Sequence, residues 1–220
     1  MFDSKVVSMI VQGIGETLYM TCVSTVFGYL LGLPVGVLCA VTDRDGIHPN
    51  RVVYRTLDFM INILRSVPFL ILLILLIPFT RFVVGKSYGP TGAIVPLVIS
   101  AAPFIARMVE SSLKEVDHGV IEAAQAMGAG NGTIIRRVLL PEARVSLIVG
   151  VTIVFGTVLG YSAMAGIVGG GGLGDIAIRY GYYRYQTDIM MVTVFLLVLL
   201  TQLFQLAGTG FAAKLDRRHS

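Results

Sequence analysis

Two glycine-containing stretches have the spacing of phosphate-binding loops. Gly169, Gly171 and Gly174 follow G-x-G-x-x-G, a pattern that binds dinucleotides when it joins a strand to a helix in a βαβ unit. Here a long apolar segment precedes the glycines, so a flexible connection is the better interpretation. Residues 85–87, Gly-Lys-Ser, match the end of a P-loop, but Thr80 occupies the place of its first glycine. We therefore predict no nucleotide site in either stretch.

Histidine and cysteine, which often bind metals or act as nucleophiles, are few. His48, His118 and His219 fall in predicted connections or the tail, where solvation is the simpler interpretation. Cys22 and Cys39 fall about 25 Å apart along one predicted helix, beyond the reach of a disulfide. The sequence contains no H-E-x-x-H and no G-x-S-x-G. We expect no catalytic residue, no metal site and no cofactor bound by this chain.

The composition predicts an integral membrane protein. Of the 220 residues, 55% are hydrophobic and 14% are charged, whereas soluble domains contain about 25% charged residues. Short connections leave no room for a soluble domain, so residues 1–220 are predicted to form one all-α transmembrane domain. The net charge of +4 comes from basic residues scattered among apolar segments. Because they form no aromatic-interleaved patch, the lipid bilayer rather than nucleic acid is the expected partner.

Five segments are long and apolar enough to cross a bilayer at about 20 residues per span. They are residues 18–41, 59–80, 92–108, 145–168 and 189–207. In the first, Gly28, Gly32 and Gly36 recur every four residues, which lets another helix approach closely. Pro96 and Pro103 fall inside the third span. Prolines at membrane depth are tolerated where neighbouring helices satisfy the freed backbone groups, so this span is predicted to lie in the bundle interior.

The distribution of basic residues predicts the orientation. With the amino terminus outside, inner connections hold eleven Lys and Arg residues and outer ones hold five, while Arg65 falls within a span. Cytoplasmic loops carry such an excess of positive charge, so the amino terminus is predicted outside. No Asp, Glu or His falls deep in a predicted span. Proton-driven carriers and intramembrane proteases usually need such residues, which argues against both classes.

The predicted inner connection at residues 119–141 has an unusual pattern. The pattern predicts a short helix of small residues, a break at a glycine, and an amphipathic helix that ends at a proline before the next span. Gly128 permits a sharp turn between the two helices, and small side chains permit close contact with a partner. On composition alone, a loop that lies on the bilayer surface remains the alternative.

This connection also matches a known signature, E-A-A, three residues, G, nine residues, then I-x-L-P. In its spacing the chain resembles the permease subunits of bacterial ABC importers, with Val138 in place of the isoleucine. In that family the segment is the coupling helix, which docks into a separate ATPase subunit. The resemblance implies an ATPase-coupling role for Glu122, Ala123, Ala124, Gly128, Ala129, Leu140 and Pro141.

The resemblance narrows to methionine importer permeases and extends from about residue 15 to residue 215. The segments that carry it are residues 63–69, 77–81, 101–107, 160–164 and the glycine run to Asp175. It implies the ABC type I importer permease fold in a bacterial inner membrane. Two copies would form the pathway as a homodimer, and two cytoplasmic ABC ATPase subunits would bind ATP and Mg²⁺. An extracytoplasmic methionine-binding lipoprotein would deliver D- or L-methionine for import by alternating access.

Candidate pathway residues lie in and near the fourth and second spans. Tyr161, Ser162 and Met164 are predicted to line the pathway or its gate, with ordinary helix packing as the alternative. Arg65 is predicted to extend to the cytoplasmic interface, or else to hold the dimer or gate. Two other functions remain open: a permease for another small solute, such as a polar amino acid or a quaternary amine, and a membrane enzyme or scaffold.

Overall fold

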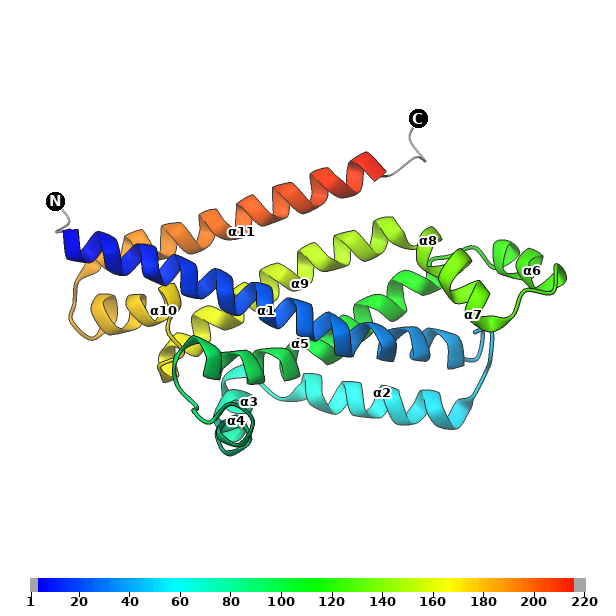
Figure 1. The fold of residues 1–220 in the computed structure, drawn as a ribbon, viewed down its shortest axis with the longest axis horizontal. Coiled ribbons are helices and arrows are strands. Elements are labelled where there is room, and N and C mark those ends of the chain that lie inside the picture. Colours follow the sequence, from blue (N-terminus) through cyan, green and yellow to red (C-terminus); the bar gives the residue numbers. More distant parts are fainter. Residues whose placement is uncertain (1–3, 216–220) are drawn as a thin grey trace.

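The computed structural model describes residues 4–215, which contain helices and no strand (Figure 1). The long helices are α1 (Ser4–Thr42), α2 (Arg51–Ser66), α5 (Gly89–Lys114), α9 (Arg144–Ala165) and α11 (Thr187–Leu215). The short helices are α3 (Phe69–Leu75), α4 (Ile77–Val84), α6 (His118–Ala126), α7 (Asn131–Ile134), α8 (Leu140–Glu142) and α10 (Gly172–Ile176). Two π-helical turns cover Ile135–Leu139 and Ala177–Tyr182, and a 3-10 turn covers Gly166–Val168. His219 and the basic residues Arg217 and Arg218 lie outside the described residues.

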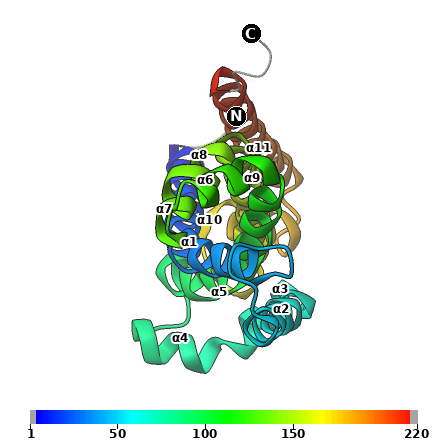
Figure 2. The same ribbon diagram turned by 90° about the vertical axis from the view of Figure 1, so that its right-hand side faces the viewer.

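The arrangement confirms an all-α membrane fold with about five spans. Among the described residues, α1, α5, α9 and α11 are long and apolar enough to cross a membrane, and α2 with α3 forms a fifth, broken span. The start of α1 and the end of α11 lie at opposite ends of the molecule, as an odd number of crossings requires (Figure 1). Figure 2 shows α11 and the α2–α4 segment on opposite sides of a centre formed by α1, α5 and α9.

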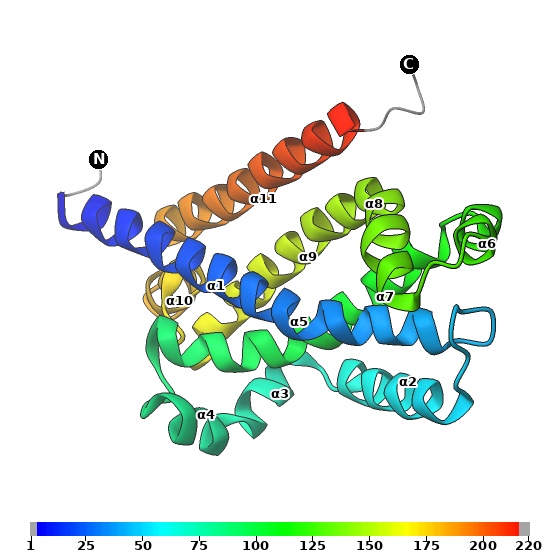
Figure 3. The same ribbon diagram turned by 45° about the vertical axis from the view of Figure 1, so that its right-hand side comes forward.

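The second span differs from the single helix predicted for residues 59–80. These residues fall in α2, α3 and α4, and the α2–α3 pair that forms the broken span is bent by 97° (Figure 3). Pro68 explains the break, because its ring disfavours helical backbone in the preceding residue. Val67 accordingly has φ −81° and ψ 122°. At the other end α2 begins at Arg51, where the Asn50 side chain accepts bonds from two backbone amides.

The first, third and fifth helices extend past the apolar segments that predicted them. The first begins at Ser4, the third continues to Lys114 and the last continues to Leu215. Residues 169–188, predicted to be a connection, contain α10 and a π-helical turn. Hydropathy marks only the part of a helix that lies in the bilayer, whereas the backbone bonds of a helix continue into water. Hydropathy therefore does not detect the polar residues at the ends of these helices.

Helix α5 lies at the centre and packs closely on α1. A Cβ atom on Gly32 would come within 2.5 Å of the Ala102 carbonyl oxygen, and one on Gly36 within 2.5 Å of the Ala106 carbonyl oxygen. This contact confirms the close helix approach predicted from the glycine spacing. With more than half of its most apolar stretch buried, α5 also fits the predicted interior position.

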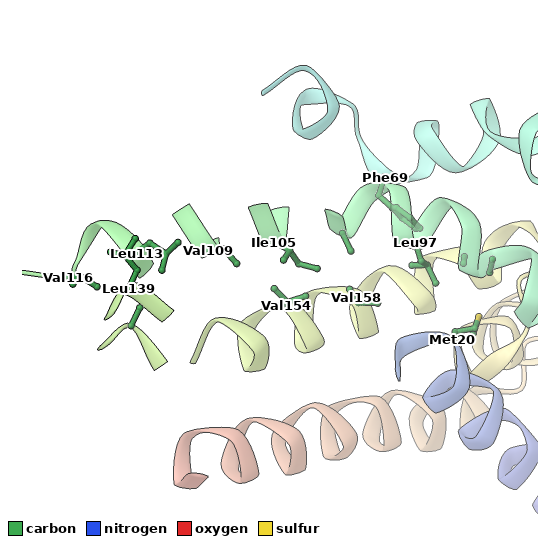
Figure 4. Packing of buried hydrophobic residues seen from close by; sticks show 14 of the residues in the cluster. Met20, Phe69, Leu97, Ile105, Val109, Leu113, Val116, Leu139, Val154 and Val158 are labelled. Carbon is green, nitrogen blue, oxygen red and sulfur yellow. The ribbon is translucent and has the colours of Figure 1, made fainter. Parts of the chain in front are cut away.

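One apolar core runs along the length of the bundle (Figure 4). Phe69 and Leu97 belong to it near one end, and Leu113 and Leu139 belong to it at the other. The core therefore joins the membrane helices to the α6–α8 end of the molecule without a polar gap.

Candidate functional site

The predicted coupling segment, residues 119–141, begins in α6. The Asp117 carboxylate caps this helix by accepting a bond of 2.7 Å from the Gly119 amide. At the other end Gly128 has φ +79°, which an L side chain rarely adopts, and the Ala129 amide donates to the Ala124 carbonyl at 3.1 Å. The sharp turn predicted at Gly128 is thus present.

Helix α6 buries one face and exposes the other. Ile121 and Ala124 are buried in the core with Ile134 of α7. Glu122 and Ala123 are exposed, and Met127 at the end of the helix is 81% exposed. The E-A-A triplet is therefore divided, because Ala124 holds α6 to the protein while its two neighbours face outward.

The second half of the coupling segment continues through a π-helical turn. The Leu140 amide donates to the Ile135 carbonyl across this wider turn, which gives room for the proline ring at Pro141. Leu140 is half-buried and Pro141 is exposed, while the Leu139 side chain between the turns is buried. Ala129, at the start of the connection, is half-buried.

The predicted pathway residues do not share one face of α9. The Tyr161 ring stacks on Phe69 of α3, with centroids 4.5 Å apart. Met164, one helical turn later, is 46% exposed. Ser162 is buried instead, and its hydroxyl donates to the Leu159 carbonyl at 2.7 Å. Arg65, in the last turn of α2, is exposed, and its guanidinium lies 5.9 Å from the centre of the Phe104 ring.

A group of charged residues that the sequence did not indicate lies between α2 and α5. Its centre is Arg107, which donates to Asp58 at 2.5 Å, to the Asn62 amide oxygen at 3.0 Å and to Glu110 at 2.8 Å. Glu110 is 2% exposed and also accepts from the Tyr54 hydroxyl at 3.1 Å. We call the set of Asp43, Tyr54, Asp58, Asn62, Arg107, Glu110 and Lys114 the ion cluster.

Lys114 extends the ion cluster to the turn after α1. Its ammonium group lies 2.8 Å from Glu110 and 2.7 Å from Asp43. Burial by itself would raise the pKa of Asp43, but the hydrogen bonds from Lys114 and from the Arg44 amide lower that pKa below its usual value. The carboxylate therefore stays charged at neutral pH. The spacing of Arg107, Glu110 and Lys114 on one helix face was a usable signal, but the predicted span ended at residue 108.

The glycine run after α9 serves packing. A Cβ atom on Gly174 would lie 2.2 Å from the Ala163 carbonyl oxygen, so only glycine fits. Side chains of α1 cap α10: Glu16 accepts from the Gly172 amide at 2.7 Å, and Thr17 accepts from the Leu173 amide at 2.9 Å. Within residues 4–215, no three His, Cys, Asp or Glu side chains are placed to bind a metal ion.

Known proteins are similar to this chain over most of its length. A family model described as the binding-protein-dependent transport system inner membrane component matches residues 32–220. The probable D-methionine transport system permease protein MetI of Vibrio cholerae is 50% identical over 203 residues, which are 92% of this chain and 90% of that protein. The D-methionine transport system permease protein MetI of Escherichia coli is 54% identical over 158 residues, which are 72% of this chain and 73% of that protein.

A solved structure has the same fold. It is described as the MetNI methionine ABC transporter in inward-facing conformations, and one of its chains superposes with a TM-score of 0.97. That chain is 50% identical, and the match covers 98% of this chain and 100% of that one. The similarity includes the coupling segment as well as the long helices. This chain therefore belongs to the family of binding-protein-dependent transport system inner membrane components, the permease subunits of ABC transporters.

Proposed function

We propose that this chain is the permease subunit of an ATP-driven importer that moves methionine, as the D or L form or both, across a bacterial inner membrane. The observation that carries the proposal is 50% identity to a probable D-methionine permease over at least 90% of both chains. The 0.97 TM-score to a chain of a methionine ABC transporter supports the same solute.

The coupling segment would bind the ATPase. Glu122, Ala123 and Met127 form the outward face of α6, where small side chains let a groove on the partner close around the helix. Gly128 ends the helix, and Ala124 anchors it to the core. Ala129, Leu140 and Pro141 would hold the second half of the segment beneath that surface.

The working assembly would contain two copies of this chain, two cytoplasmic ATPase subunits and an extracytoplasmic methionine-binding lipoprotein. The ATPase subunits would bind ATP and Mg²⁺, so this chain needs no cofactor of its own. Transport would follow alternating access between inward-facing and outward-facing states. ATP can drive that change only if it binds the two states with different affinity.

The pathway would pass the outer face of α9. Tyr161 and Met164 lie one helical turn apart on this helix; Tyr161 is half-buried against the edge of the core and Met164 is exposed. Ser162 would stabilise α9 from the buried side, through its bond to Leu159. Arg65 would lie near the pathway wall rather than at the cytoplasmic interface, because it is at the end of α2 away from the inner connection and beside Phe104.

Reconstitution tests this proposal. The chain is purified with its ATPase and lipoprotein, placed in proteoliposomes and given labelled D-methionine or L-methionine with ATP on the ATPase side. We expect ATP-dependent uptake of at least one enantiomer, with no competition from an excess of a polar amino acid or a quaternary amine. The same assay is repeated with the competitor labelled. ATP-dependent uptake of the competitor, and none of methionine, would show that the proposed solute is wrong.

A further inference from the structure

Helix α2 contacts the rest of the bundle through a small apolar cluster and through polar side chains. Its single buried residue is Ile61, which packs with Cys39 of α1 and Ala106 of α5. Leu57 of α2 packs against the same small cluster, and the ion cluster supplies polar contacts, in which Arg107 of α5 binds both Asp58 and Asn62 of α2. Two of the three side-chain hydrogen bonds between α5 and α2 in the ion cluster are therefore made by Arg107, and the third joins Glu110 to Tyr54.

Arg107 is in turn held in place by Glu110. A carboxylate with 2% exposure is costly without partners, so Glu110 keeps Arg107 and Lys114 beside it wherever this part of α5 moves. The guanidinium is a planar fork that bonds in fixed directions. Together these contacts make a rigid connection from α5 to α2.

One end of this connection lies beside the coupling segment. Lys114 is the last residue of α5, and its neighbour Leu113 belongs to the same buried core as Ile121 and Ala124 of α6. A displacement of α6 would therefore reach the end of α5 through this shared core.

The other end of the connection leads to the candidate pathway. Helix α2 ends at Ser66, the chain bends at Pro68, and Phe69 begins α3 with its ring stacked on Tyr161 of α9. A short two-residue link transmits movement well, because it leaves few free dihedral angles between α2 and α3.

We propose that Arg107 and Asp58 are positioning residues of the transport cycle: they transmit movement of the coupling segment through α2 to the Phe69–Tyr161 contact. This inference rests on the proposed function. A second route exists, because the apolar core also runs from α6 to Phe69 through α5 (Figure 4). The experiment must separate the polar route from that apolar one and from a purely structural role.

The first variant is Asp58→Asn in the reconstituted complex. Asparagine keeps the size of the side chain and leaves Arg107 paired with Glu110, so we expect normal yield of the complex and a normal Tm. We expect several-fold less methionine imported per ATP hydrolysed, and several-fold less stimulation of hydrolysis by the lipoprotein. The matched control is Asp45→Asn, which changes an exposed carboxylate in the connection between α1 and α2. It should change neither the methionine imported per ATP nor the stimulation by the lipoprotein.

The second arm combines Asp58→Asn with Phe69→Leu, which removes the ring stack but keeps an apolar side chain. The free-energy effects of mutations at distant, independent sites usually add. If the two substitutions have additive effects on import per ATP and on stimulation by the lipoprotein, they act through separate routes. We expect instead that the double variant loses little more than Phe69→Leu alone.

Three results would decide against the inference. The two ratios could stay unchanged in Asp58→Asn, the double variant could be fully additive, or uptake could fall only in proportion to the yield of complex. Failure of the proposed function looks different, since the unsubstituted complex would then import no methionine. If the solute were not methionine, the effect of Asp58→Asn on stimulation by the lipoprotein would still test the inference. If the chain bound no ATPase, both the proposed function and the inference would be wrong.

Discussion

The rings of Phe69 and Tyr161 stack nearly parallel, with 5° between their planes and 4.5 Å between their centroids. Phe69 is the first residue of α3, directly after the bend at Pro68, and Tyr161 lies in the last part of α9. The contact therefore joins the broken second span to the helix that carries the candidate pathway residues.

Replacing Tyr161 by alanine should reduce transport while the complex still assembles. A stacked aromatic pair contributes about 0.5–1.5 kcal/mol, enough to change a balance between two conformations up to about tenfold. Uptake in proteoliposomes measures the effect, and Tyr161→Phe, which keeps the ring, should transport normally. Full uptake by the alanine variant would remove Tyr161 from the pathway.

Replacing Gly32 by alanine should destabilise the helix bundle. The added methyl group would meet the Ala102 carbonyl at 2.5 Å, and overpacking of this kind costs about 1–3 kcal/mol. We expect the Tm of the purified chain in detergent to fall by several degrees. Gly15→Ala is the control on the same helix, because a Cβ atom there has no neighbour within 4 Å. An equal Tm for both variants would contradict the close α1–α5 contact.

Replacing Gly128 by valine should prevent stable binding of the ATPase. At φ +79° a β-branched residue is strained by about 1–3 kcal/mol, so the turn after α6 should rearrange. The membrane helices are not touched, and the variant should reach normal membrane levels. A pull-down and an uptake assay on the same membranes should both show a loss of several-fold or more.

The control for Gly128 is Gly130→Val, which places the same side chain at φ −71°. Neither glycine has a neighbour within 4 Å of a built Cβ atom, so only the backbone conformation differs within this chain. We expect clearly better ATPase binding by the Gly130 variant. If Gly128→Val retains full binding and full uptake, the assignment of the coupling segment is wrong.

Reporter fusions should place Lys86 and Arg179 outside, and Asn131 and the carboxyl terminus inside. The expectation follows from the excess of basic residues in the predicted inner connections. The structure brings the two outer connections together, since the Gly89 amide donates to the Gly169 carbonyl at 2.8 Å. A cytoplasmic signal from a fusion at Arg179 would contradict the five-span topology.

The sequence by itself determined the class of fold, and it predicted the turn that ends the first helix of the proposed coupling segment. Each apolar segment partitions into a bilayer on its own, so hydropathy within about 20 residues is enough to identify a span. The turn at Gly128 and the close approach at Gly32 were also readable, because both follow from the properties of glycine at one position or along one helix face.

Only the tertiary structure decided which charges and helices meet. Asp58 and Arg107 are 49 positions apart, and the Glu16 carboxylate that caps α10 is 156 positions from its partner amide. Pro68 is visible in the sequence, but the size of the bend, 97°, and its direction depend on what α3 packs against. A charge in a helical bundle takes its partner from whichever helix lies beside it. That neighbour is set by packing, which no local pattern contains.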